Sequence, residues 1–140
     1  MIPQALIALL SIVRLGAIHA VVFGGFSAQS LAQRIEAARP RMVITASCGV
    51  EGTKGAIPYK PLVDDAVEQS VWKPEKVFVW QREESRWDGI DKGRGQRDWR
   101  KAVNSARHRK VKAECVPVGS EDGCYVIYTS GTTGRCLRCS

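Results

Sequence analysis

The chain has 140 residues, of which 44% are hydrophobic and 25% are charged, so it is long enough for one domain with a real core and too apolar for general disorder. Its formal net charge is +7. Five cysteines at irregular spacing argue against a secreted disulfide framework, and two isolated histidines leave the pair Cys136 and Cys139 without the further ligands that a zinc site needs, so we expect no metal site.

The N-terminal segment has apolar residues at helical spacing, which predicts a helix from Pro3 to about Gly16. The apolar stretch 5–23 has no acidic residue and resembles a targeting segment in this respect. Arg14 lies inside the stretch, however, where a charge is costly for a membrane span and misplaced for a secretory signal. We therefore expect no membrane span.

Four short apolar runs predict buried strands, at residues 20–23, 42–45, 76–80 and 125–128. Helices are expected between them: one that Ser27 caps and that ends at Arg39–Pro40, one that begins at Pro61, and one at 98–106. The stretches 49–55 and 81–96 are expected to be loops. Because apolar strands alternate with helices, the predicted fold class is α/β, a parallel-type sheet with covering helices.

Basic residues are concentrated between Lys92 and Lys112, where nine Lys or Arg accompany one acidic residue, Asp98. Such a block attracts polyanions, or it is simply a solvated face. We expect no nucleic-acid groove here, because Trp99 is the only aromatic side chain in the block for stacking on bases.

The last predicted strand runs into the sequence YTSGTTG at residues 128–134. Glycine permits the backbone geometry that points successive N–H groups at an anion, so this run is either a phosphate-binding turn or an ordinary polar turn. It matches neither the Walker A pattern nor the dinucleotide-binding fingerprint. The candidate phosphate-binding residues are Thr129, Ser130, Gly131, Thr132, Thr133 and Gly134.

The run resembles the phosphate loop of the adenylate-forming superfamily, the AMP-dependent synthetases and ligases. Upstream, RLGAIHAVVFGGFS at residues 14–27 is similar to a block of the short-chain branch, the acetyl- and propionyl-CoA synthetases. VITA at 43–46 and PLVDDA at 61–66 continue the resemblance in the expected order, so it spans nearly the whole chain.

The resemblance implies the large N-terminal domain of an enzyme that joins acetate or propionate to coenzyme A. Such enzymes use ATP and Mg²⁺ to form an acyl-adenylate and pyrophosphate, and then transfer the acyl group to the thiol. Carried over, residues Thr129 to Gly134 would contact the ATP phosphates. Lys54 would contact the coenzyme A nucleotide, although its segment 52–55 also reads as a plain surface loop.

The resemblance ends at Gly134, because the family continues to Pro-Lys-Gly where this chain has RCLRCS at residues 135–140. The loop lysine is thus absent, and arginine is no neutral replacement for it. We expect a truncated copy, with a partial AMP-binding domain at 1–134, a divergent tail at 135–140, and no catalysis alone. A compartment, mitochondrial matrix or cytosol, would be inherited from the full-length relative. Two alternatives remain: a phosphate-binding module without chemistry, and a basic interaction protein.

Overall fold

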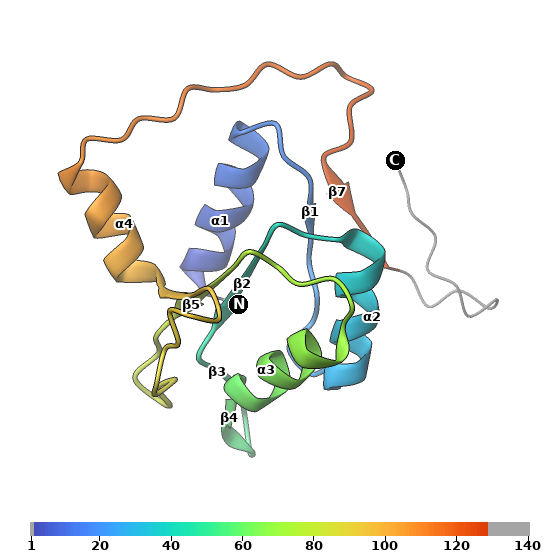
Figure 1. Cartoon of the computed structure of the whole chain (residues 1–140), viewed down its shortest axis with the longest axis vertical. Coiled ribbons are helices and arrows are strands. Elements are labelled where there is room, and N and C mark those ends of the chain that lie inside the picture. The colour runs from blue at the N-terminus through green and yellow to red at the C-terminus, as the bar shows by residue number, and fades with distance from the viewer. Residues whose placement is uncertain (1, 129–140) are drawn as a thin grey trace. The chain divides into compact units, whose positions relative to one another are not determined.

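A computed structural model describes residues 2–128 of the chain. The chain divides into two compact units, one formed by its two ends and the other by residues 22–111. The elements of both units are labelled in Figure 1. No helix in the described part of the chain has the length and apolar character needed to cross a membrane.

The unit formed by the two ends contains helix α1 (Pro3–Arg14) and the parallel pair of strands β1 (His19–Ala20) and β7 (Tyr125–Val126) (Figure 1). Gly16 follows α1 with a φ of 64°, a conformation that glycine adopts at little cost after a helix. The predicted N-terminal helix is therefore confirmed, with its end two residues early.

The strand predicted at 20–23 is shorter than expected and begins at His19. The chain is already turning at the far end of this apolar run, because the Phe26 N–H donates to the Phe23 carbonyl oxygen at 3.2 Å. Phe23 and Val21 are consequently exposed, which shows that an apolar run alone does not define the end of a strand.

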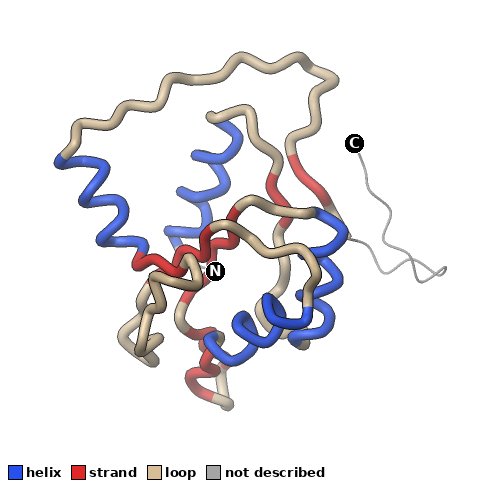
Figure 2. The backbone as a smooth tube through the Cα atoms, viewed as in Figure 1, coloured by secondary structure: helices blue, strands red, loops and turns tan. Residues whose placement is uncertain are grey.

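The unit 22–111 is built on a parallel three-stranded sheet in the order β2 (Met42–Ala46), β5 (Lys76–Trp80), β6 (Gln96–Asp98). Helices α2 (Ala28–Ala38), α3 (Lys60–Gln69) and α4 (Trp99–His108) accompany the strands. The alternation of helix and strand along this unit can be followed in Figure 2. The α/β class with parallel pairing is confirmed.

The two faces of β5 have different neighbours. Val77 and Val79 point to one face, where they form the main buried cluster with Val63 of α3 and with Trp87. On the opposite face, the guanidinium of Arg100 in α4 lies 4.5 Å from the centre of the Trp80 ring. The sheet is thus covered by α3 on its apolar face and approached by α4 on the other.

Two helix starts follow the capping rules. The Ser27 hydroxyl accepts a hydrogen bond from the Ser30 N–H at 3.2 Å, which confirms the predicted cap of α2. Asp98 caps α4 in the same way, accepting from the Lys101 N–H at 2.9 Å. Arg39 ends α2 in the left-handed conformation, with a φ of 45°.

Two predicted loops contain strands. The stretch 49–55 belongs to an antiparallel hairpin of β3 (Cys48–Glu51) and β4 (Gly55–Pro58), and the stretch 81–96 ends in β6. Both predictions were wrong in these parts because the strands are short and rich in glycine or charged residues, so their hydrogen-bonded partners rather than their side chains define them.

Candidate functional site

The carboxyl ends of β2 and β5 are tied together by Ser47, which follows β2 directly and is 1% exposed. Its hydroxyl donates to the Ser85 carbonyl oxygen at 2.6 Å and accepts from the Arg82 N–H at 2.9 Å. Its backbone N–H donates to the Trp80 carbonyl oxygen at 2.9 Å. Ligands of open α/β sheets bind at such carboxyl ends, so Ser47 fixes the geometry of the edge where a site is expected.

Tyr59 connects this edge to Gly24, which lies in a turn, and to Gly49 of strand β3. Its backbone N–H donates to the Ser47 carbonyl oxygen at 2.9 Å, and its hydroxyl lies against two glycines from different segments. A Cβ added to Gly24 would lie 2.1 Å from this hydroxyl oxygen, and one added to Gly49 would lie 2.2 Å from it. Both positions therefore need glycine as long as the Tyr59 ring keeps its place.

The phenol of Tyr59 is held in its neutral form. Burial raises its pKa above the ordinary value near 10, and the negative charge of Glu51 raises it further, while Arg82 opposes both effects. A neutral phenol at physiological pH can donate a hydrogen bond as well as accept one. Tyr59 thus bridges the turn at 24–25 and the hairpin with a polar side chain.

Lys54 lies at the tip of the β3–β4 hairpin, whose strands pair Glu51 with Gly55. The Lys54 N–H donates to the Glu51 carbonyl oxygen at 2.8 Å, and Gly55 follows with a φ of 71°, the pattern of a three-residue hairpin loop. The ammonium group is 3.2 Å from a carboxylate oxygen of Glu51 and its side chain is 72% exposed. Lys54 is therefore accessible to solvent and forms an ion pair with Glu51.

The segment that follows the Gly24–Gly25 turn is held by contacts among its own side chains. Phe26 meets Phe23 edge to face at 6.1 Å, and the guanidinium of Arg34 lies 4.4 Å from the centre of the Phe26 ring. Such cation–π contacts contribute about 0.5–1 kcal/mol at exposed sites. The Gly24–Gly25 turn is thus followed by Phe26, which contacts Arg34 of α2, and it is contacted by Tyr59, which follows the hairpin.

The predicted phosphate-binding residues, Thr129 to Gly134, lie outside the described residues, as do Cys136 and Cys139. The strand that leads to them is described: β7 pairs in parallel with β1, with His19 opposite Tyr125 and Ala20 opposite Val126. Among the predicted site residues, the structure therefore places Lys54 alone. No cluster of three or more metal-ligating side chains occurs among residues 2–128.

Sequence reasoning missed Ser47 and Tyr59. A serine after a strand and a tyrosine before a helix are common, and neither position has a local signal for its role. The glycines that contact Tyr59 are visible in the sequence, but Gly24 is 35 positions from Tyr59 and Gly49 is 10 positions from it. Only the folded chain brings them together.

Comparisons with known proteins give a consistent result. Residues 1–136 match the family model described as AMP-binding enzyme. An uncharacterized protein of Pseudomonas aeruginosa is 47% identical over 135 residues, and the mitochondrial acyl-CoA synthetase short-chain family member 3 of Bos taurus is 43% identical over 136. The propionate–CoA ligase of Salmonella typhimurium is 38% identical over 135 residues.

These alignments cover 96% of the chain and 19% to 21% of each relative. The chain thus spans about a fifth of the length of the curated relatives that it matches.

Proposed function

The chain belongs to the AMP-binding enzyme family, with short-chain acyl-CoA synthetases among its relatives, and from this we propose that it forms the ATP-phosphate grip of such a synthetase. The observation that carries the proposal is the glycine- and hydroxyl-rich run Thr129 to Gly134, which begins three residues after the end of the parallel strand β7. Backbone N–H groups and hydroxyls at the end of a strand are suited to phosphate oxygens.

In the proposed reaction, a carboxylate oxygen of the substrate attacks the α-phosphorus of ATP, and pyrophosphate leaves. The thiol of coenzyme A then attacks the carbonyl carbon of the acyl-adenylate, and AMP leaves. Residues of this chain serve the first step by binding and charge stabilisation, with the Thr132 and Thr133 hydroxyls donating to the β- and γ-phosphates. Mg²⁺ would neutralise part of the phosphate charge when bound.

For the second step we propose that Lys54 contacts a phosphate of coenzyme A. Its exposure at the hairpin tip supports this role, since the ammonium group can leave Glu51 for a more highly charged partner. The proposed acyl substrates are acetate and propionate. Propionate draws its support from the name of the Salmonella relative, and the mitochondrial relatives support a mitochondrial location over the cytosol for the whole protein.

The 140-residue chain alone is proposed to bind nucleotide without completing the ligation. Arg135 and Arg138 occupy the region where the family's loop has Pro-Lys-Gly, and arginine does not place a compact charge as lysine does. Catalysis at phosphate groups depends mainly on how precisely cationic groups are positioned. Loss of the loop lysine is therefore expected to lower the reaction rate more than the affinity for nucleotide.

Calorimetric titration of the purified chain with ATP and Mg²⁺ tests the grip. We expect micromolar binding that Gly131→Val removes and that Gly52→Val leaves unchanged, since a Cβ at Gly52 meets nothing within 4 Å. Equal ATP binding by both variants would refute the proposed phosphate-binding role of Thr129 to Gly134. Acetate- or propionate-dependent release of pyrophosphate by the 140-residue chain would refute the proposed lack of ligation.

A further inference from the structure

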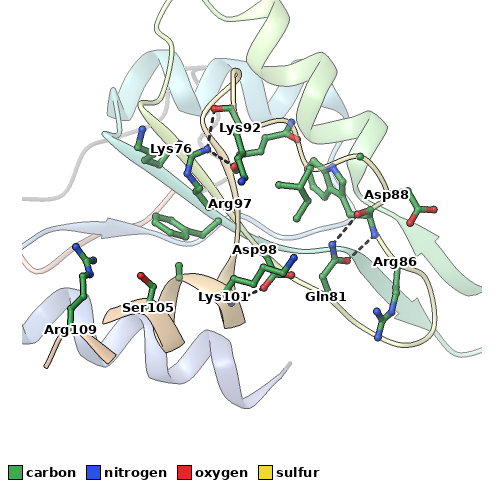
Figure 3. A pocket seen from close by; sticks show the side chains of 16 residues that line it. Lys76, Gln81, Arg86, Asp88, Lys92, Arg97, Asp98, Lys101, Ser105 and Arg109 are labelled. Atoms are coloured by element: carbon green, nitrogen blue, oxygen red, sulfur yellow. Dashed lines mark hydrogen bonds between the residues drawn. The ribbon is translucent and has the colours of Figure 1, made fainter. Parts of the chain in front are cut away.

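A hollow of about 830 Å³ lies on the face of β5 and β6 that α4 approaches, within the unit 22–111. Figure 3 shows its lining side chains, which come from the sheet, from the segment 86–92 and from α4. Lys101, Ser105 and Arg109 follow one another at intervals of four residues and therefore share one side of the helix. Phe78 contributes an aromatic side chain from the sheet.

The lining is strongly basic. Six cationic side chains contribute to it, against the two acidic residues Asp88 and Asp98; the cations are Lys76, Arg86, Lys92, Arg97, Lys101 and Arg109. Four of the six come from the basic block of residues 92–112, and the fold adds two from outside that block.

Little within the described residues neutralises these cations. The ion pairs found there, five in number, include none of the six. Arg97 uses its guanidinium to donate to the carbonyl oxygens of Lys92 and Gln96, at 3.0 and 2.7 Å, which fixes it in place without neutralising it. The Asp98 carboxylate accepts from the first turn of α4 and so has less capacity left for a cation.

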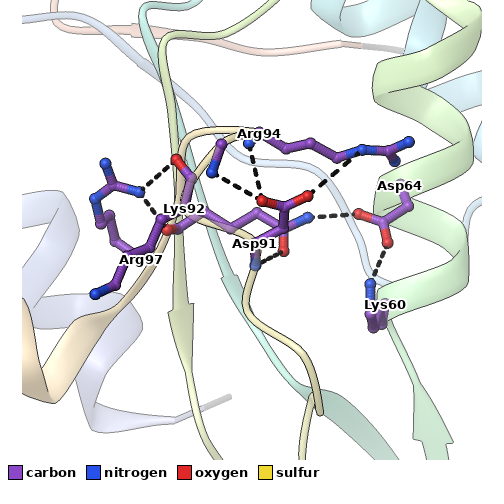
Figure 4. A network of polar contacts seen from close by, with 8 residues as sticks. Lys60, Asp64, Asp91, Lys92, Arg94 and Arg97 are labelled. Carbon is purple, nitrogen blue, oxygen red and sulfur yellow. Dashed lines mark hydrogen bonds and ion pairs between the residues drawn. The ribbon is translucent and has the colours of Figure 1, made fainter.

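The wall of the hollow is fixed by a polar network (Figure 4). The Gln96 side chain, 3% exposed, donates to Asp64 at 2.8 Å and accepts from the Asp91 N–H at 3.0 Å. Asp91 in turn accepts from the Gly93 N–H at 2.8 Å. Through Asp64 of α3, this network ties the segment that carries Lys92 and Arg97 to the helix.

Trp87 contributes to the lining of the hollow and also belongs to the buried cluster with Val63, Val77 and Val79. It lines the hollow, is 2% exposed, and its indole Nε1 is buried without a hydrogen-bond acceptor among residues 2–128. A buried donor without an acceptor costs about 1–3 kcal/mol. An oxygen-rich ligand that reached this atom would supply the acceptor.

We propose that this basic hollow binds a small molecule with at least two phosphate groups. Its volume lies in the range of small-ligand sites, and six cations match a ligand with several negative charges better than a single anion. A nucleic-acid strand is disfavoured, because of the two aromatic side chains in the lining, Phe78 and Trp87, the second is 2% exposed and belongs to the buried cluster, which leaves one ring for stacking on bases. The site is independent of the proposed ATP contact at Thr129 to Gly134.

Titration of the 140-residue chain with tripolyphosphate at low ionic strength tests the proposal. Lys101→Glu is the test variant, because glutamate three residues after the capping Asp98 is favourable for the helix and the fold is expected to survive. Arg107→Glu is the matched control: it makes the same change of charge on the same helix, outside the hollow. Gly131→Val separates the hollow from the phosphate loop.

We expect Lys101→Glu to weaken tripolyphosphate binding at least about tenfold, with less than a twofold change for Arg107→Glu and for Gly131→Val. Equal weakening by the two charge reversals would mean a diffuse field and would overturn the proposal. Loss of binding in Gly131→Val with retention in Lys101→Glu would assign the anion to the phosphate loop instead. An oligonucleotide that binds while tripolyphosphate fails to compete would also overturn it.

Discussion

The hydroxyl of Tyr59 packs against Gly49, which has no Cβ to separate them. Gly49 lies in β3, the first strand of the hairpin, and Tyr59 directly follows β4, the second strand. The two residues are ten positions apart, and the hairpin β3–β4 lies between them. The Tyr59 side chain, after the second strand, thus packs against the first strand, and the same hydroxyl also contacts Gly24.

Gly49→Ala is expected to destabilise the fold by about 1–3 kcal/mol, because the new methyl would lie within 2.2 Å of the Tyr59 oxygen and the ring must move. Chemical denaturation monitored by circular dichroism measures this loss. Gly52→Ala in the same hairpin is the control, since its methyl meets nothing within 4 Å. If Tyr59→Leu does not relieve the cost of Gly49→Ala in a double-mutant cycle, the contact is not its cause.

Gly95 and Gly89 separate backbone strain from steric overlap. Their φ angles are similar, 76° and 67°, but a Cβ at Gly95 would lie 2.5 Å from the Glu75 carbonyl oxygen, while one at Gly89 meets nothing within 4 Å. We expect Gly89→Ala to cost about 1 kcal/mol, from the left-handed backbone alone, and Gly95→Ala to cost about 3 kcal/mol or more. Equal losses of thermal stability would show that the backbone beside Glu75 yields easily.

Asp98 has a structural and an electrostatic role that two variants distinguish. Asp98→Ala removes the cap of α4 and is expected to cost about 1 kcal/mol of unfolding free energy. Asp98→Asn keeps a capping oxygen and is expected to cost only a few tenths of that, while removing a negative charge from the basic hollow. Calorimetry should therefore find tighter tripolyphosphate binding in Asp98→Asn; weaker binding would contradict an electrostatic role for the hollow.

The ion pair of Arg41 and Glu75 predicts a measurable pH effect. The hydrogen bond from Arg41, 2.9 Å long, and the arginine charge lower the pKa of the Glu75 carboxyl. Since the folded-state pKa lies below the unfolded one, the pair stabilises the fold above the ordinary carboxyl pKa, and this contribution is lost as the pH falls through the lowered pKa.

Carboxyl chemical shifts followed by NMR give the Glu75 pKa directly. We expect Arg41→Gln to return it to the ordinary range and the neighbouring Arg39→Gln to leave it unchanged. Both groups are exposed, so the effect on global stability is expected to be small. A Glu75 pKa that does not respond to Arg41→Gln would contradict the pairing.

The sequence predicts those helices and strands whose own residues form a recognisable pattern, such as an apolar run or a helix cap. The apolar residues of β5 and the capping Ser27 of α2 are local features, and both elements occur where they were expected. Strand β6 was missed because Gln96 and Arg97 have no strand propensity of their own, and pairing with Val77 and Phe78 makes them a strand.

The site was less predictable than the fold, because its contacts join distant segments. Lys54 was placed correctly in an exposed connection, although the connection is the tip of a hairpin. The roles of Ser47 and Tyr59 depend on carbonyl and glycine partners that the pattern of the chain does not reveal. The phosphate-binding role of Thr129 to Gly134 stays a prediction.

The pairing of β1 with β7 has a consequence for the order of folding. His19 and Tyr125 are 106 positions apart (125 minus 19), whereas Val43 and Val77 of the central sheet are 34 apart. Bringing distant segments together costs chain entropy that grows with the length of the loop, so local contacts form first. We expect residues 22–111 to fold early and to shorten the effective loop between the two ends. The pairing of β7 with β1 would then be among the last contacts to form.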